Sequence, residues 1–318
     1  MKKISILMVL LAIVLQANAE TKEEIKFGNF NQWISRTIKE SSLLGGKTKT
    51  IYAIGPTQKF DGAKAYTNMG GSPWATSNVY ANVLGIVKVS GTVTPDDHEG
   101  HGKCVKMSTV LEHLKAIGIV NMDVMVSGSI FLGRMFEPIK SSKNPYSKME
   151  MGVKYTKRPK YLQFDYKVHV PTNATKVYSS GFGKKKTLAG QDEAEVYILL
   201  QRRWEDEKGN IHAARVGTGR ERYSKSTSGW VNNHRIEVHY GDITKQSFYK
   251  PWMGLINGEK SYYAQNSKGK VVKVIEEQWD EPNATPTHLM VMASSGCGTA
   301  YEGTEGMVLW VDNISLIF

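Results

Sequence analysis

The sequence lacks any apolar run long enough to cross a bilayer. Its longest, Ile4–Leu15, falls well short of the roughly 20 residues that a membrane-spanning helix needs. Two lysines precede this run, and an Ala-x-Ala site ending at Ala19 follows it, directly before the charged segment that starts at Glu20. This arrangement is typical of a bacterial secretory signal peptide. We therefore expect residues 1–19 to be cleaved and the mature chain to be periplasmic or secreted, with no transmembrane segment. No cysteine follows the run, which argues against a lipoprotein anchor.

Cysteine is scarce, with only Cys104 and Cys297 in the chain. In an oxidising compartment the two could form one disulfide, which would join an early strand to the C-terminal loop and argue for a single domain. They could equally be two separate, buried small side chains. Pairing cannot be derived from sequence, so both alternatives stay open.

Long clusters of one charge are also missing. Loss of two lysines with the signal peptide leaves 39 basic and 30 acidic residues, a net charge of +9. The basic residues are spread along the chain, and their longest uninterrupted cluster is Lys184–Lys186. This pattern favours a solvated basic surface over a nucleic-acid patch, so no nucleic acid is expected as a partner. Attraction to an acidic polysaccharide or an anionic outer surface stays open.

Recognisable metal motifs are missing too. The densest group of potential ligands is Pro95–His101, with two aspartates, one glutamate and two histidines. Its spacing fits neither a His-Glu-x-x-His motif nor an EF-hand loop, and adjacent residues on a turn seldom converge on one ion without distant partners. We predict a polar turn between two strands here. Asn29 and Asp312 could offer oxygens to a structural calcium, but strand-end hydrogen bonds explain both. The sequence therefore predicts no metal and no cofactor.

Strand patterns, in contrast, are plentiful. Alternating apolar and polar residues over Arg158–Pro171 predict a half-buried antiparallel strand, and residues 191–217 predict a β-hairpin. Near the C-terminus, an apolar run at Leu289–Met292 and a β-rich run at Met307–Phe318 flank a glycine-punctuated loop. We expect two strands there, the last one tied into a sheet. Together these patterns indicate an all-β fold, a β-sandwich or jelly roll, in one domain over residues 20–318.

Six short motifs follow one another in the second part of the chain: Gly128–Gly133, Arg158-Pro159 with Leu162–Lys167, Asp192 before Val196–Leu200, Met290–Ser295, Gly303 with Gly306, and Leu309–Asp312. In this order they resemble the putative carbohydrate metabolism domain (PCMD) family of Bacteroidetes, over about Trp74 to Phe318. The resemblance implies an exported jelly roll, similar to carbohydrate-binding modules, without established catalytic residues. The sequence departs from the family in lacking a separate N-terminal immunoglobulin-like domain. It also has Asp312-Asn313 where two acids are expected, which weakens the argument for calcium.

The resemblance favours a noncatalytic, glycan-binding accessory protein of polysaccharide utilisation, whose partner is a polysaccharide or oligosaccharide. Sugar rings stack on exposed aromatic side chains, while planar amide, carboxylate and guanidinium groups bind their hydroxyls. The aromatic-rich stretch from Trp230 to Trp279 could supply such a platform, although any single aromatic of a large sandwich is more often in the core. The predicted binding face consists of Trp74, Asn78, Arg134, Trp230 and Trp252.

The alternative is a glycoside hydrolase or lyase that uses a pair of carboxyl groups at a set separation. Acidic residues that could form such a pair are Asp165, Glu193, Glu195, Glu237, Asp242, Glu276 and Glu277. None of them lies in a catalytic motif, so the sequence assigns no catalytic residue. A structural or adhesive surface role fits the same fold, because fold does not determine function.

Overall fold

The computed structural model describes residues 20–66, 69–116, 120–141, 143–172, 175–181 and 183–318. The predicted signal peptide, residues 1–19, lies outside them. Strands dominate the described chain, and its helical segments are 3-10 turns of three or four residues. None of the described helices has the length and apolar character to cross a membrane. The predicted all-β fold is confirmed.

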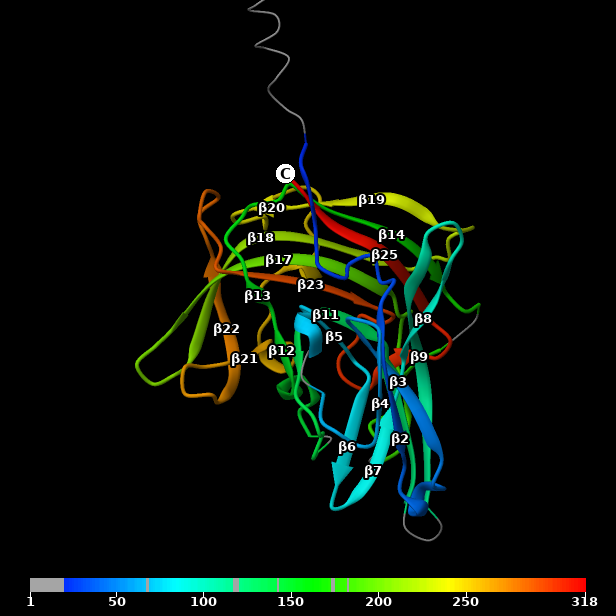
Figure 1. Cartoon of the computed structure of the whole chain (residues 1–318). Coiled ribbons are helices and arrows are strands. Elements are labelled where there is room, and N and C mark those ends of the chain that lie inside the picture. The colour runs from blue at the N-terminus through cyan, green and yellow to red at the C-terminus, as the bar shows by residue number, and fades with distance from the viewer. Residues whose placement is uncertain (1–19, 67–68, 117–119, 142, 173–174, 182) are drawn as a thin grey trace, which may run out of the picture.

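One layer is a seven-stranded sheet built around the C-terminal strand (Figure 1). That strand, β25 (Val308–Ile317), pairs antiparallel with β14 on one side and with β9 and the short β1 on the other. The prediction that the last strand is tied into a sheet is therefore confirmed. The order is β10 (Val120–Ser127), β9 (Gly102–Ala116), β25, β14 (Tyr161–His169) and β19 (Val231–Glu237), with β8 (Val93–His98) on β9 and β1 (Lys22–Glu24) on β25.

The second layer is a ten-stranded sheet that closes into a ring. Its order is β13 (Val153–Lys154), β23 (His288–Ser294), β17 (Ala194–Glu205), β18 (Ile211–Tyr223), β22 (Val271–Trp279), β21 (Tyr263–Gln265), β12 (Met149–Met151), β11 (Ser129–Met135) and β5 (Trp74–Thr76), with β20 (His239–Tyr240) on β18. The ring closes because β11 also pairs with β23. The predicted hairpin is confirmed as β17 and β18, which pair over their whole length.

Two apolar cores lie on opposite faces of β17, because alternate residues of a strand point to opposite sides. Val196, Ile198 and Leu200 face the first core, which lies between the two layers and includes residues of β14 and β25. Tyr197 and Leu199 face the second core, which fills the ring with residues of β11, β12, β21, β22 and β23. The layered packing confirms the predicted β-sandwich.

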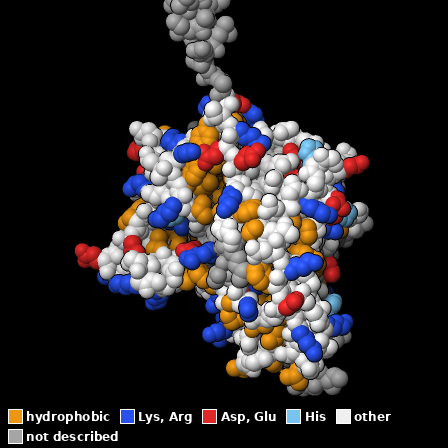
Figure 2. Space-filling model, viewed as in Figure 1, with side chains coloured by type: hydrophobic (Ala, Val, Ile, Leu, Met, Phe, Trp, Pro, Cys, Tyr) orange, Lys and Arg blue, Asp and Glu red, His pale blue; other side chains and the backbone are white. Residues whose placement is uncertain are grey.

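Smaller elements surround the two layers. The short sheets are β3 (Thr48–Ile54), β2 (Trp33–Lys39) and β4 (Gln58–Asp61); β16 (Lys186–Thr187), β15 (Lys176–Tyr178) and β24 (Glu302–Thr304); and the hairpin β6 (Val79–Val83) and β7 (Ile86–Ser90). The 3-10 turns are η1 (Ser42–Leu44), η2 (Met69–Gly71), η3 (Pro145–Lys148), η4 (Pro251–Met253) and η5 (Gly258–Lys260). Figure 2 shows that basic and acidic side chains are interspersed on the face in view. The one-domain organisation of residues 20–318 stays a prediction, although β1 pairs with the C-terminal strand.

Candidate functional site

Polar side chains lie toward both ends of the ring, and apolar side chains lie between them. β17 provides both kinds, since Glu195, Tyr197, Leu199, Gln201 and Arg203 follow one another on the ring side of the strand. The two apolar members are buried in the second core. The charged and amide members form two separate hydrogen-bonded networks, one at each end.

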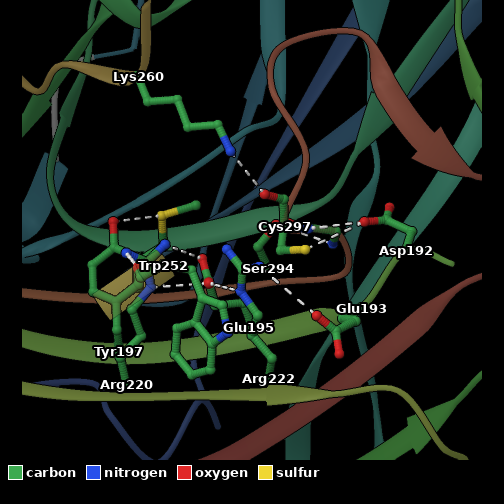
Figure 3. A network of polar contacts seen from close by, with 12 residues as sticks. Asp192, Glu193, Glu195, Tyr197, Arg220, Arg222, Trp252, Lys260, Ser294 and Cys297 are labelled. Carbon is green, nitrogen blue, oxygen red and sulfur yellow. Dashed lines mark hydrogen bonds and ion pairs between the residues drawn. The ribbon is translucent and has the colours of Figure 1, made fainter. Parts of the chain in front are cut away.

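The first network is centred on Glu195 of β17 (Figure 3). Arg220 of β18 binds both carboxylate oxygens, with its Nε and Nη2 each 2.9 Å from an oxygen. Arg222, two residues along the same strand, donates from Nε to Oε1 at 2.7 Å, and its Nη1 lies 3.8 Å from Glu193. Arginine and carboxylate planes match in this two-pronged geometry, which makes the pair strong and well oriented. Strand pairing between β17 and β18 sets the geometry, because Glu195 lies directly opposite Arg222.

Trp252 lies against this network from η4. The Arg220 Nη1 donates to the Trp252 backbone carbonyl at 2.6 Å, which attaches η4 to the end of the ring. The Arg222 guanidinium lies 4.8 Å from the centre of the indole ring, within range of a cation–π interaction. Trp252 is only partly buried. The result is an indole fixed in position, in contact with a guanidinium and close to two carboxylates.

Lys260 of η5 and the loop after β23 complete the network. The Lys260 ammonium donates to the Cys297 carbonyl at 3.3 Å, and burial, with Arg222 nearby, lowers its pKa. Asp192 is fully buried and accepts from the Cys297 amide at 3.3 Å. Burial raises the pKa of the Cys297 thiol to about 11. The thiol is therefore protonated near neutral pH, which makes it a poor nucleophile.

The second network closes the opposite end of the ring. Glu276 of β22 accepts from Arg215 at 2.7 and 2.5 Å and also from Gln201, and both members of this ion pair are fully buried. The backbone amide of Ile256 donates to the same carboxylate at 2.6 Å. Burial acts to raise the pKa of Glu276, but Arg215, the Ile256 amide and Gln201 together outweigh it, so the pKa lies below its ordinary value. The ion pair at this end is fully buried, whereas Trp252 and Lys260 at the other end, here called the open end, are partly exposed.

Two of the predicted binding residues are in the wrong place for that role. Trp74 is fully buried in the first core, edge-on to Phe30 at 5.5 Å. Asn78 is also buried, and its side-chain amide bridges the backbones of Tyr52 and Val93. The prediction that these two residues contact sugar is wrong, because their polar and aromatic groups are already used inside the protein.

The other three predicted residues do not share one surface. Arg134 is exposed on β11, where it pairs with Glu150 and donates to Gln265 at 3.1 Å. Trp230 precedes β19 in the seven-stranded sheet and stacks on a histidine. Of the five residues, only Trp252 lies in the network at the open end of the ring.

Glu195 was predicted only as one acid among several, and its basic partners were not predicted. Their signal is the triplet at residues 220–222, in which two arginines flank a glutamate. Residues two apart share one face of a strand, so the two arginines face the same way. The strand in question runs farther than the predicted hairpin, which ended at Gly217.

The two cysteines are separate. Cys104 is a buried free thiol on β9, and Cys297 is a partly buried free thiol in the loop after β23. The alternative of a disulfide is therefore contradicted. Cys104 fits the alternative of a small buried side chain, and burial raises its pKa to about 12.

Most of the acids considered for catalysis are dispersed, although Glu193 and Glu195 share Arg222. Asp165 belongs to the seven-stranded sheet, Glu277 pairs with His212 at 2.6 Å, and Glu195 and Glu276 are each held by arginines. Glu237 and Asp242 differ from these, because both line a shallow depression of about 290 Å³. Its wall also contains His239 and Phe248, whose rings stack at 4.0 Å.

Comparison with known families gives one match. The model of a family described as Putative carbohydrate metabolism domain (PCMD) matches residues 56–317. This range includes every residue of both ring networks. No curated protein matches the chain significantly.

Three solved structures are similar at low identity. One is described as a putative glycoside hydrolase from Bacteroides thetaiotaomicron VPI-5482, with 16% identity and a TM-score of 0.45, covering 86% of this chain and 76% of that one. Another is described as a putative glycoside hydrolase from Bacteroides vulgatus ATCC 8482, with 13% identity and a TM-score of 0.44, covering 79% and 96%. The third is a carbohydrate-binding module specific for non-crystalline cellulose, CBM28, with 9% identity and a TM-score of 0.29, covering 78% and 89%. We assign no residue role from these likenesses.

Proposed function

This chain belongs to the putative carbohydrate metabolism domain (PCMD) family, and from that premise we propose that it is a noncatalytic, glycan-binding accessory protein of polysaccharide utilisation. The observation that carries the proposal is the partly exposed Trp252 ring held against Arg222 at the open end of the ring. Sugar rings present apolar faces that pack on an indole, and their hydroxyls bind to planar charged groups beside it.

The network keeps donors available for such hydroxyls. A guanidinium has five N–H donors, and Arg222 uses its Nε to hold Glu195. An ammonium has three donors, and the Lys260 bond to a backbone carbonyl uses one of them. Glu193 is about 30% exposed in its side chain and can accept from a hydroxyl. Both oxygens of Glu195 already accept from arginines, so its role is to fix the site in place and not to attack or protonate a glycosidic bond.

Replacing Trp252 with alanine is expected to weaken glycan binding at least about tenfold, which corresponds to about 1.4 kcal/mol. The mature chain should first be screened on a glycan array, and the affinity of the best glycan then measured by isothermal titration calorimetry. Trp204→Ala is the matched control. Trp204 lies on β17 and not on η4, and it is 38% exposed, so its loss should leave the affinity unchanged. Equal affinities for wild type and Trp252→Ala would contradict the proposed site.

Hydrolysis is the second candidate, and the depression that Glu237 and Asp242 share is the observation that favours it. The binding proposal expects no release of reducing ends when the mature chain is incubated with the bound glycan. Steady release that stops in Glu237→Gln or Asp242→Asn would replace the binding function with a hydrolytic one. Release that continues in both variants would point to a contaminating enzyme.

We also propose that the protein is exported, since residues 1–19 have the sequence pattern of a signal peptide. Expression of the full chain in a Gram-negative host is expected to yield a product whose N-terminus is Glu20, recovered outside the cytoplasm. N-terminal sequencing and fractionation measure this directly. A cytoplasmic product that begins at Met1 would overturn the proposal.

A further inference from the structure

A cluster of potential metal ligands lies on the seven-stranded sheet, away from the ring. His98 ends β8, His101 lies in the turn before β9, and Asp165 belongs to β14. Their ligand atoms all lie within 4.8 Å of one another. The turn supplies two ligands, and strand pairing through β9 and β25 brings in the third from far along the chain. This is the distant partner that a group of ligands on a turn requires.

A fourth residue orients the cluster. Asp312 of β25 is fully buried, and its Oδ2 lies 2.8 Å from Nδ1 of His98. A carboxylate can only accept, so Nδ1 carries the hydrogen and the lone pair of Nε2 is left for a metal ion. A carboxylate behind a histidine in this way is the usual outer support of a metal ligand. The Asn313 amide in turn fixes Asp312, donating to Oδ1 at 2.8 Å.

Hydrogen bonds also fix both carboxylate oxygens of Asp165 in place. Its Oδ1 accepts from the backbone amide of Asn233 at 2.6 Å, and its Oδ2 accepts from the side chain of Asn313 at 2.8 Å. Each oxygen keeps a further lone pair for an ion. The strand register shifts next to Asp165, and Asn313 has φ of 53°, so a bulge places both groups at this point. Bulges of this kind commonly re-aim side chains at functional sites.

The cluster contains two buried carboxylates, whose negative charge a cation would balance. Asp165 is 4% exposed and Asp312 is 0% exposed, and the two lie opposite each other in the sheet. Among the residues that the structure describes, no lysine or arginine forms an ion pair with either carboxylate. The hydrogen bonds that these carboxylates accept from Asn233 and Asn313 come from neutral groups, so their buried negative charge stays costly, and a divalent ion would compensate both.

Aromatic rings cover the buried histidine of the cluster on both faces. The His98 ring lies between Trp230, with ring centres 3.7 Å apart, and His101, with ring centres 4.2 Å apart. Trp230 therefore covers a histidine in place of the predicted sugar platform.

We propose that His98, His101 and Asp165 bind a divalent transition-metal ion of the zinc class, with Asp312 as the positioning residue. Two imidazoles and one carboxylate suit zinc, whereas calcium prefers oxygen donors alone. Tetrahedral zinc holds its ligand atoms about 3.4 Å apart. An imidazole binds a metal in the plane of its ring, so the His101 ring, which stacks on His98, has to turn toward the ion. His101 is exposed, and Gly100 and Gly102 beside it have φ of 79° and 96°, so the turn can adjust. The bound ion joins the β8–β9 turn to β14.

Zinc binding to the full mature chain tests this directly. Protein stripped with a chelator is titrated with zinc chloride in a calorimeter, and the thermal midpoint is measured with and without zinc. One zinc per chain and a raised midpoint are expected, together with a cobalt-substituted absorption spectrum typical of tetrahedral sites. Asp312→Asn is expected to weaken binding by 10–100-fold, the usual effect of removing an outer partner of a ligand.

His101→Ala is the decisive variant, because an exposed side chain can be removed without unfolding the chain. It should weaken zinc binding by about 100-fold or more and remove the zinc-dependent rise in the midpoint. His113→Ala is the matched control, since His113 is an exposed histidine paired with Asp123 on the neighbouring strands. Cys297→Ser controls for zinc held by the partly buried thiol. The proposal is overturned if His101→Ala binds zinc like the wild type, or if Cys297→Ser alone abolishes binding.

Discussion

Replacing Arg215 with methionine is expected to lower the free energy of unfolding by about 3–5 kcal/mol. Arg215 and Glu276 are both fully buried, and the arginine donates to each carboxylate oxygen. Methionine fills similar space but leaves the carboxylate unpaired in a medium that solvates charge poorly, and this unpaired charge accounts for most of the loss. Urea denaturation at pH 7, followed by fluorescence, measures the difference.

The matched control is Arg134→Met on the same ring. Arg134 is paired with Glu150, but its side chain is 46% exposed, so its loss should cost less than about 1 kcal/mol. Acid provides a second check. Because the pKa of Glu276 is lowered in the folded state, its contribution to stability is present above the unfolded pKa and is lost as pH falls through the folded pKa. The gap between wild type and Arg215→Met should therefore narrow in acid. Equal costs for Arg215→Met and Arg134→Met would show that the ring does not depend on its buried pair.

The strands of this protein could be predicted because their signals are local. Alternation identified β14, and a glycine-containing turn identified the β17–β18 hairpin. Closure of the ring could not be predicted in this way. It depends on the parallel pairs β18–β22 and β12–β21 and on the extra pairing of β11 with β23, and no turn sequence specifies these contacts. The nearly continuous apolar run of β17 is a local sign that the ring closes, since both faces of this strand are covered by apolar cores.

The segment Pro95–His101 shows that a site formed by distant strands is equally hard to predict from local sequence. The predicted polar turn between strands is confirmed only for Glu99–His101, because Pro95–His98 belongs to β8 and pairs with β9. The third potential ligand, Asp165, lies within the predicted strand at Arg158–Pro171, but its burial was not predicted. Sequence distance hides this contact, because β25, the last strand of the chain, lies between the two partners.

Aromatic residues were the least predictable part of the binding site. Trp74 and Trp252 both lie beside proline in loop-like sequence, at Pro73 and Pro251. One is fully buried against Phe30, and the other is partly exposed beside Arg222. The difference comes from what packs over each residue in three dimensions. The sequence around each tryptophan does not indicate which of the two is buried.

Replacing Trp74 with alanine is expected to lower the free energy of unfolding by about 3–5 kcal/mol and to leave the glycan affinity of the folded protein unchanged. The substitution removes a fully buried indole from the first core, together with the hydrogen bond from Nε1 to the Lys26 carbonyl at 3.1 Å. The cavity left behind adds to the loss of buried apolar surface. Chemical denaturation measures the first effect, and calorimetry below the unfolding transition measures the second.

Two variants make this test specific. Trp74→Phe keeps an aromatic ring on β5 and should recover part of the lost stability, whereas the exposed Trp204→Ala should cost less than about 1 kcal/mol. Trp252→Ala should show the opposite combination to Trp74→Ala, with weakened glycan binding and a small change in stability. If Trp74→Ala is as stable as the wild type but no longer binds glycan, Trp74 belongs to the binding face. That outcome would contradict its burial in the core.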